Sequence, residues 1–468
     1  MTTINPDIYH RLQSRLSERL QTQLNKFRIP GAAIAIYHQD NPLEAAVGSA
    51  NLEAGIDVDP HTVFQIGSTT KVYTATLMIM LVDEGLIELD APVSRYLPDL
   101  QIDNHPTPDA LTVRSLLDYS AGMEGDYFAD FGPGPEALER YVNACHTLQY
   151  IHPPGEMRAY NSTAYCIAGR VIEAVTGRYY EDVLQEKLLQ PIGTERFGFY
   201  THDVIRYRTA IGHEVDQKTG ELRAVDNLRL PHCMSAAGAS LSMTAKDLLR
   251  FGCFHLNNGV TRDGKPLVCS DLIQQMRTPY KIVPPSDSEL LMGWAALESD
   301  RGRVTVASGM THGQNSFLAL LPAEKLAISI LANTATGANQ IFLDLGVELI
   351  KALSGATVCI PEGRDLRDLK PVPLAEVDTQ ELLGEYLNGT QLEISENSEG
   401  LQMTATYDMP DRPEPVQEIV RLVPIGDNKF LTEKEDTPSQ VVEFLFADGE
   451  SSPASQVFCQ NRLFARRR

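Results

Sequence analysis

The sequence predicts an α+β fold: an antiparallel sheet flanked by helices, with a largely helical subdomain, followed by a small all-β domain. Strand-like runs open and close the first 358 residues, with mainly helical stretches between them. One antiparallel sheet built from both ends satisfies that order. Short strand-like runs fill the C-terminal part, and 468 residues exceed one typical core, so we expect two domains.

The N-terminal segment supplies the first predicted elements. Apolar residues recur every four positions, as in an amphipathic helix: Ile8, Leu12, Leu16, Leu20 and Leu24. The runs IPGAAIAIYHQ (29–39) and EAAVGSANLE (44–53) predict two strands joined by a short turn. A helix is expected from Ser68 to Glu84, because Gly85 is placed to end it.

Helices dominate the middle of the predicted first domain, and strands return near its end. The predicted helices are LTVRSLLDYSAGM (111–123) and TAYCIAGRVIEAVTG (163–177). The later strands are GRVTVASG (302–309), NSFLALLP (315–322) and LAISILANT (326–334), and NQIFLDLGVELIKALSG (339–355) closes the domain as a helix.

The C-terminal part differs in composition. We assign residues 1–358 to the first domain and the proline- and charge-rich residues 359–374 to a linker. Residues 375–468 contain short strand-like runs separated by turns, among them GLQMTATYD and EIVRLVPIG. That spacing predicts a small antiparallel barrel or sandwich.

Composition narrows the class of function. The net charge of −22 argues against nucleic acid as a partner and disfavours strongly anionic substrates, because both require clustered Lys and Arg. Seven scattered cysteines without a CxxC pair, and no apolar signal or membrane-length run, predict a soluble cytoplasmic protein. No HExxH spacing or nucleotide-binding glycine pattern occurs, so we expect no metal and no cofactor. The expected partner is a small-molecule or peptide substrate, and the oligomeric state is left open.

The stretch FQIGSTTKVYTA (64–75) carries the strongest chemical signal. Ser68 and Lys71 are three residues apart at a helix start, so their side chains share one face. The helix dipole and burial both disfavour an ammonium there, which predicts an uncharged Lys71 that removes the proton of Ser68. Free N–H groups at the helix start can hold an oxyanion. A capping serine followed by a solvated lysine is the alternative interpretation.

Several segments resemble, in the same order, the serine β-lactamase and penicillin-binding protein family, nearest to its class C, esterase and D-aminopeptidase branch. They are RIPGAAIAIY, the SxxK segment, LTVRSLLDYSAGM, PPGEMRAYNSTAYCIAG and AAGASLSMTAKDLLRF. The resemblance covers roughly residues 26–353 and implies the β-lactamase/transpeptidase-like fold. From about residue 375 the chain is similar to the lipocalin-like barrel appended to some members.

The resemblance also implies roles for individual residues. Ser68 would be the acylated nucleophile, Lys71 would assist its deprotonation, and Tyr160 would exchange protons with the nucleophile and the leaving group. A tyrosine beside an ammonium has a lowered pKa, which suits that task. The backbone N–H groups of Ser68 and Met310 would form the oxyanion hole. Ser162 holds the place of the family's usual asparagine and Asn161 comes one residue early, so both are candidate substrate-binding residues.

The third motif of the family, usually Lys-Thr-Gly, is altered. Ala307 replaces the basic residue in VASGMTHGQNSF (306–317), which leaves Ser308 and Gly309 as candidate substrate contacts. His312 is a candidate substitute for the missing basic group. The literal KTG at residues 218–220 lies in a polar stretch before the expected place and predicts a surface hairpin turn.

A missing cation at residue 307 predicts poor binding of a substrate carboxylate, such as that of a β-lactam. The sequence therefore predicts a serine hydrolase or acyltransferase that acts through acyl-Ser68 on an ester, an amide or a peptide, including substrates with D-amino acids. We expect weak or no β-lactamase activity. The alternatives are a biosynthetic peptide cyclase or thioesterase-like acyl transferase of the same fold, and a catalytically inactive binding protein that retains the fold.

Overall fold

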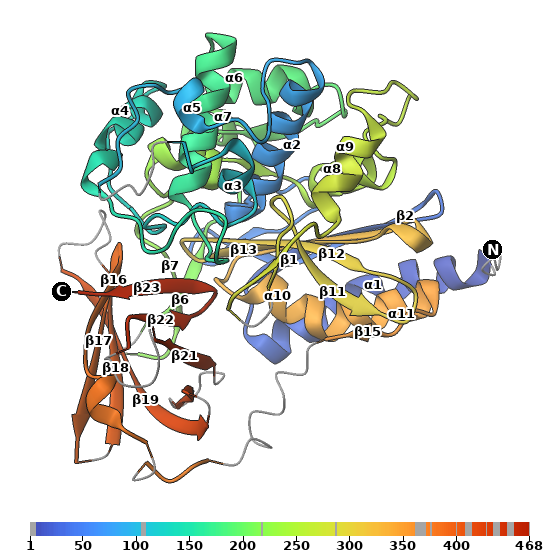
Figure 1. The fold of residues 1–468 in the computed structure, drawn as a ribbon. Coiled ribbons are helices and arrows are strands. Elements are labelled where there is room, and N and C mark those ends of the chain that lie inside the picture. The colour runs from blue at the N-terminus through green and yellow to red at the C-terminus, as the bar shows by residue number, and fades with distance from the viewer. Residues whose placement is uncertain are drawn as a thin grey trace.

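The computed structural model places an α/β body beside a β-barrel, with the barrel packed against one side of the body (Figure 1). The described residues are 6–103, 109–216, 219–285, 288–360, 371–374, 377–398, 400–407, 414–426, 428–433, 440–446 and 454–467. Most of the segment predicted as a linker, at residues 361–370, lies outside these ranges.

An eight-stranded antiparallel sheet forms the centre of the first body. Its order is β15 (Val358–Cys359), β11 (Ala295–Ser299), β12 (Val304–Thr311), β13 (Gln314–Leu321), β14 (Leu326–Ala332), β1 (Gly31–His38), β2 (Asn41–Asn51) and β3 (Ile56–Asp57). β1 pairs with β14, with Ile34 opposite Ile330, so both ends of the domain meet in one sheet. The prediction of an antiparallel sheet built from both ends is confirmed.

One face of the sheet is covered by the first and last helices of the domain (Figure 1). These are α1 (Pro6–Phe27), α10 (Gly337–Ile341), the π-helical turn η7 (Phe342–Gly346) and α11 (Val347–Ser354). Leu16, Leu20 and Leu24 of α1 are buried in an apolar cluster that also contains Ile34 and Ile328. The side chains at this four-residue spacing therefore face the sheet, as in an amphipathic helix.

The opposite face carries the helical region, which contains the candidate site. Its helices are α2 (Thr70–Asp83), α3 (Val113–Leu117), α4 (Ala137–Ala144), α5 (Thr163–Thr176), α6 (Tyr180–Leu184), α7 (Thr201–Val204), α8 (Ala245–Leu256) and α9 (Ser270–Arg277). Residues 70–81 of α2 are all buried, so this helix runs through the centre of the region. None of the helices in the described ranges has the length and apolar character needed to span a bilayer.

Short elements connect these helices. Three two-residue strands, β4 (Phe64–Gln65), β8 (Ser242–Met243) and β5 (Phe197–Gly198), form a small sheet, and the pairs β6 (His213–Val215) with β7 (Leu222–Ala224) and β9 (Ile282–Val283) with β10 (Ser288–Glu289) form hairpins. Single 3₁₀ turns are η1 (Gly67–Thr69), η2 (Val93–Arg95), η3 (Cys145–Thr147), η6 (Pro322–Glu324) and η9 (Thr379–Glu381), η4 (Gln185–Leu189) is a π-helical turn, and η5 (His232–Ala237) is a pair of 3₁₀ turns with a kink at Met234.

One predicted helix is much shorter than expected. The helix expected over residues 111–123 is limited to α3, which ends after Leu117. Tyr119 adopts a φ of 66°, and Asp118 accepts hydrogen bonds from the backbone N–H and the hydroxyl of Ser120 at 2.9 and 2.6 Å. This local bonding replaces the next helical turn, because an aspartate side chain competes with the helical carbonyl for nearby donors.

The C-terminal strands close into an eight-stranded antiparallel barrel. They are β16 (Gly384–Asn388), β17 (Thr390–Asn397), β18 (Gly400–Tyr407), β19 (Val416–Gly426), β20 (Lys429–Glu433), β21 (Val441–Leu445), β22 (Gln456–Cys459) and β23 (Arg462–Arg466). Alternate residues, such as Leu401, Met403 and Ala405 of β18, are buried in the interior. Arg466 in β23 donates to the carbonyl oxygens of Leu383 and Glu381 at 2.7 and 2.6 Å. One end of the barrel faces the first body.

Candidate active site

Ser68 lies in η1, where strand β4 leads into helix α2. The neighbouring Gly67 has a φ of 54°, and a Cβ at this residue would lie 2.6 Å from Met310 N. Gly309 is equally restricted, since its Cβ would lie 2.6 Å from Ser68 N. Glycine at both positions allows β12 to run directly against the turn that carries the serine.

Lys71 reaches Ser68 from the first turn of α2. Its Nζ donates a hydrogen bond to Ser68 Oγ at 3.2 Å and another to the carbonyl oxygen of Ala237 at 2.6 Å. The side chain is buried, and Nζ lies 4.8 Å from the centroid of the Tyr160 ring. The three-residue spacing therefore brings the amino group and the hydroxyl together, rather than leaving a solvated lysine beside a helix cap.

Tyr160 approaches the same serine from the loop before α5. Its hydroxyl donates to Ser68 Oγ at 2.6 Å, and its ring stacks on Tyr119 with a centroid distance of 5.4 Å. Burial by itself raises the pKa of Tyr160, but the positive charge of Lys71, hydrogen bonds with Lys71 and Ser68, and the charge of Arg462 outweigh it. The pKa of Tyr160 is therefore below the usual value for a phenol, which favours proton exchange.

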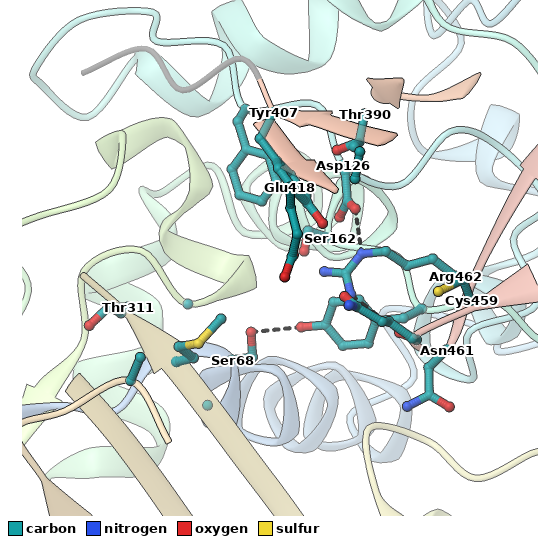
Figure 2. A pocket seen from close by; sticks show the side chains of 18 of the residues that line it. Ser68, Asp126, Ser162, Thr311, Thr390, Tyr407, Glu418, Cys459, Asn461 and Arg462 are labelled. Atoms are coloured by element: carbon teal, nitrogen blue, oxygen red, sulfur yellow. Dashed lines mark hydrogen bonds and ion pairs between the residues drawn. The ribbon is translucent and has the colours of Figure 1, made fainter. Parts of the chain in front are cut away.

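The two residues after Tyr160 lie in different surroundings. Ser162 lines the cavity above Ser68 (Figure 2). Asn161 is buried, and its amide donates to Met123 O and accepts from Ala164 N, both at 2.7 Å. Asn161 does not line the cavity, and its amide instead links the loop at Met123 to the first turn of α5.

Strand β12 and the turn after it form another wall of the cavity. Ser308, Gly309, Met310 and His312 all line it, and the Met310 side chain is 58 % exposed. Ala307, at the position of the missing basic residue, is buried. The strand that carries Ala307, Ser308 and Gly309 thus lies against the Ser68 turn.

The literal KTG motif lies elsewhere. Thr219 and Gly220 belong to the turn between β6 and β7, and Lys218 lies outside the described residues. Gly220 has a φ of 71°, with open space where a Cβ would stand, and it does not line the cavity. The hairpin-turn interpretation fits this location.

The barrel contributes to the site through the turn between β22 and β23. The carbonyl oxygen of Asn461 accepts a hydrogen bond from Tyr160 N at 2.6 Å. The Arg462 guanidinium carbon lies 4.9 Å from the centroid of the Tyr160 ring, and its Nε forms an ion pair with Asp126 of the first body. The backbone and the ring of Tyr160 are therefore both held by the C-terminal domain.

A second barrel turn, between β16 and β17, clamps the loop that carries Asp126. Asn388 Oδ1 accepts from Gly125 N at 2.5 Å, and Gly389 N donates to Glu124 Oε1 at 3.3 Å. Gly389 has a φ of 69°, and a Cβ at this residue would lie 2.2 Å from Asp126 O. The two bodies thus make close backbone contact beside the serine.

The resulting cavity has a volume of about 660 Å³ and is shared by both bodies. Its barrel side carries Thr390, Tyr407, Glu418, Cys459 and Arg462 at the open end, with Leu392, Met403, Ala405, Val420 and Phe464 deeper inside. Figure 2 places Tyr407, Glu418 and Arg462 across the cavity from Ser68. Within the described residues, no group of three or more His, Cys, Asp or Glu is arranged to hold a metal ion.

Sequence reasoning missed all of these barrel residues and Asp126. The alternation in EIVRLVPIG does predict Glu418 on the same face as Val420 and Leu422, which is the interior of a barrel. A charged residue on an otherwise apolar face was the available signal. Nothing in the local sequence indicates that this end of the barrel closes over Ser68.

Comparison with known proteins identifies a family and several relatives that this chain resembles. The profile of the Beta-lactamase family matches residues 16–347. Penicillin-binding protein 4 of Amycolatopsis lactamdurans is 32% identical over 351 residues, which are 74% of this chain and 91% of that protein. Unguisins hydrolase ungD' of Aspergillus campestris is 25% identical over 358 residues, 72% of this chain and 65% of that protein.

Solved structures match both bodies together. The crystal structure of SurE covers 98% of this chain and 100% of its own, with a TM-score of 0.75 and 24% identity. An octameric penicillin-binding protein homologue from Pyrococcus abyssi covers 97% and 99%, with a TM-score of 0.62 and 21% identity. At these identities the likeness concerns the fold, and it includes the barrel.

Proposed function

The chain belongs to the Beta-lactamase family, and we propose that it is a serine hydrolase or acyltransferase that works through an acyl-Ser68 intermediate. One observation carries the proposal. Lys71 Nζ and the Tyr160 hydroxyl both hydrogen-bond to Ser68 Oγ, at 3.2 and 2.6 Å. A serine needs an adjacent base to become a nucleophile, and this pair supplies one.

We assign the base to Tyr160 and the supporting positive charge to Lys71. The positive charge of Lys71 lowers the pKa of Tyr160 and so favours its phenolate form. In this scheme that form accepts the proton of Ser68 Oγ as the serine attacks the substrate carbonyl. The sequence expectation gives this step to an uncharged Lys71, whereas the contacts around the phenol favour Tyr160. The oxyanion forms beside the backbone N–H groups of Ser68 and Met310, which then hold its charge.

The remaining steps reuse the same proton. Tyr160 gives it to the leaving group, the carbonyl bond re-forms, and the acyl group remains on Ser68 Oγ. Water or an amine then attacks the acyl carbon and loses its proton to Tyr160. Tyr160 passes this proton to Ser68 Oγ as the product departs.

Substrates without a carboxylate near the reacting carbonyl fit this cavity best. Ala307 offers no charge, so an ester, an amide or a peptide should be preferred over a β-lactam. D-amino acid residues are included because the structural relative SurE has been crystallised with D-Leu.

Transfer to an amine, as in peptide cyclisation, is a second candidate. It is favoured by the cavity of about 660 Å³ that the barrel and the first body form together, which has room for an acyl group and a second reactant. An inactive binding protein is disfavoured, since such a protein has no need for an amine and a phenol that both contact one serine hydroxyl.

The test is covalent labelling with turnover. Wild-type protein incubated with p-nitrophenyl acetate should release p-nitrophenol and carry one acetyl group on the peptide containing Ser68. Ser68→Ala should lose both signals, and Ser162→Ala, which changes another serine of the same cavity, should keep the adduct. An adduct on a different residue, or equal release by Ser68→Ala, would reject the proposal.

A further inference from the structure

The cavity above Ser68 extends into the interior of the barrel. Its lining includes residues of the strands β17, β18, β19, β20, β22 and β23. Inward- and outward-facing residues alternate along each strand, and the inward set of β17 and β18 is buried. Leu392 stands opposite Ala405, and Met403 stands opposite Val420, so these residues face one enclosed space. Eight-stranded barrels leave an interior that can hold one small ligand.

The lining becomes apolar with depth on one side of the barrel. Thr390 and Tyr407 lie at the mouth, across the cavity from Ser68 (Figure 2). Along β18 the lining runs from Tyr407 to Met403, a depth of roughly 13 Å at about 3.3 Å per residue. The deeper lining residues of β17, β18, β19 and β23 form one apolar wall, which consists of Leu392, Met403, Ala405, Val420 and Phe464.

Packed side chains close the far end of this space. Ile394, Leu401 and Leu422 follow the apolar wall on the inward faces of their strands, and each is at most 2 % exposed. They belong to the apolar core of the barrel and do not line the cavity. The barrel interior is therefore a space of limited depth that communicates with Ser68, within a cavity whose 660 Å³ is typical of small-molecule sites.

A space closed at its far end suits the part of the substrate that stays on the enzyme. The acyl group remains bonded to Ser68 Oγ between the two half-reactions, whereas the leaving group must depart and water or an amine must enter. A leaving group inside the barrel could depart only past the acyl-serine. The apolar wall therefore fits the acyl group, because each methylene moved there from water favours binding.

We propose that the barrel interior binds the apolar part of the acyl group, either an alkyl chain or an apolar amino acid side chain. This inference rests on the proposed function at Ser68, whose substrate class it names. Ala405 is a specificity-determining residue in this scheme. Its side chain is small and buried in the middle of the apolar wall, so it leaves the space open where a larger side chain would fill it.

The length of the acyl chain tests the inference during turnover by the full-length protein. Wild-type protein should hydrolyse p-nitrophenyl hexanoate with a kcat/KM at least ten-fold above that for p-nitrophenyl acetate. Ala405→Leu should remove this preference, because the added side chain fills the interior. Thr404→Leu, which adds the same side chain on the outward face of β18, should keep the preference.

Equilibrium binding to Ser68→Ala protein tests the same space without turnover. N-phenyl-1-naphthylamine is an uncharged probe whose fluorescence rises in apolar surroundings, and it should bind with enhanced emission. Hexanamide should displace it at concentrations at which acetamide does not. Adding Ala405→Leu should weaken probe binding at least ten-fold, and adding Thr404→Leu should leave it unchanged.

The inference would be overturned by equal kcat/KM values for the two esters, by a preference that Ala405→Leu leaves intact, or by an equal loss in Thr404→Leu. Absence of probe binding, or equal displacement by the two amides, would also overturn it. The wild-type ester ratio and the displacement by hexanamide decide the question even where Ala405→Leu does not fold. Displaceable probe binding in a protein whose Ser68 accepts no acyl group would instead contradict the proposed function.

Discussion

The hydroxyl of Tyr160 donates a 2.6 Å hydrogen bond to Ser68 Oγ across 92 positions of the chain. The backbone N–H of the same tyrosine donates to Asn461 of the barrel, and Arg462 lies against its ring. One residue thus joins the nucleophile to the C-terminal domain. We infer that the barrel positions the proton-transfer group as well as enclosing the substrate.

Loss of either proton-transfer partner should greatly slow turnover. Tyr160→Phe and Lys71→Ala are each expected to reduce kcat for a p-nitrophenyl ester by at least ~100-fold, the usual contribution of a positioned acid–base group. Tyr37→Phe is the control, because its hydroxyl bonds to Asp40 in the β1–β2 hairpin. A near-normal rate in either variant would remove that residue from the mechanism.

The pH dependence of kcat/KM should reflect the ionisation of the Tyr160 phenol. Because the pKa of Tyr160 is lowered, kcat/KM should rise with pH along a limb whose midpoint lies below 10, the usual phenol value, and Tyr160→Phe should abolish it. Removing the positive charge of Arg462 raises the pKa of the phenol, so the limb should move to higher pH.

The double variant Asp126→Asn/Arg462→Met tests that shift without leaving the Asp126 carboxylate buried beside an apolar residue. Arg462→Lys keeps the charge and should shift the limb less. An unchanged limb in the double variant would mean that Arg462 does not act on Tyr160.

Close contact at Gly389 should couple barrel docking to activity. Gly389→Ala would place Cβ 2.2 Å from Asp126 O, whereas Gly220→Ala has a similar φ of 71° and meets open space. Gly220→Ala should therefore cost only the about 1–2 kcal/mol of a left-handed residue and keep activity. Gly389→Ala should lower the melting temperature further and reduce ester turnover. Equal effects of both substitutions would argue against the coupling.

Poor β-lactam turnover is expected from the uncharged third motif. With Ala307 in place of a basic residue, nitrocefin should be hydrolysed far more slowly than a neutral p-nitrophenyl ester, because its carboxylate finds no cation there. Both rates can be followed by absorbance under the same conditions. Rapid nitrocefin hydrolysis that disappears in Ser68→Ala would contradict this expectation.

Glu173 should make stability depend on pH. Burial raises its pKa to about 7, although the carboxylate accepts a hydrogen bond from Tyr180 N. Between its ordinary pKa of 4.5 and 7 the folded protein binds more protons than the unfolded chain, so stability falls as pH rises through that window. Glu173→Gln removes this loss and should raise the melting temperature more at pH 8 than at pH 5.

The control for that measurement is Glu139→Gln, a more exposed carboxylate that also pairs with Arg170. It should change the melting temperature similarly at the two pH values. A pH-independent effect of Glu173→Gln would show that the Glu173 carboxylate does not control stability in this range.

Apolar periodicity predicted the helices and strands well where the apolar side chains of the segment are buried in the core. The elements α1, β12, β13 and β14 were predicted from apolar pattern alone, since α1 packs on one apolar cluster and β13 and β14 are buried between that cluster and a second one. The helix expected at 111–123 was too long because Asp118 and Ser120 bond to each other instead of continuing the turn. Competition of this kind depends on side-chain geometry that apolar periodicity does not contain.

The sequence by itself determined the antiparallel sheet, a C-terminal domain of short strands and the Ser68–Lys71 pair, because helix and strand periods fix which neighbouring residues share a face. Only the tertiary structure decided that Tyr160 meets Ser68 between two domains, that Asn161 is used by the fold, and that Glu418 and Arg462 reach the cavity. These contacts join residues far apart in the chain, and their distances follow from how the barrel docks, which no local pattern encodes.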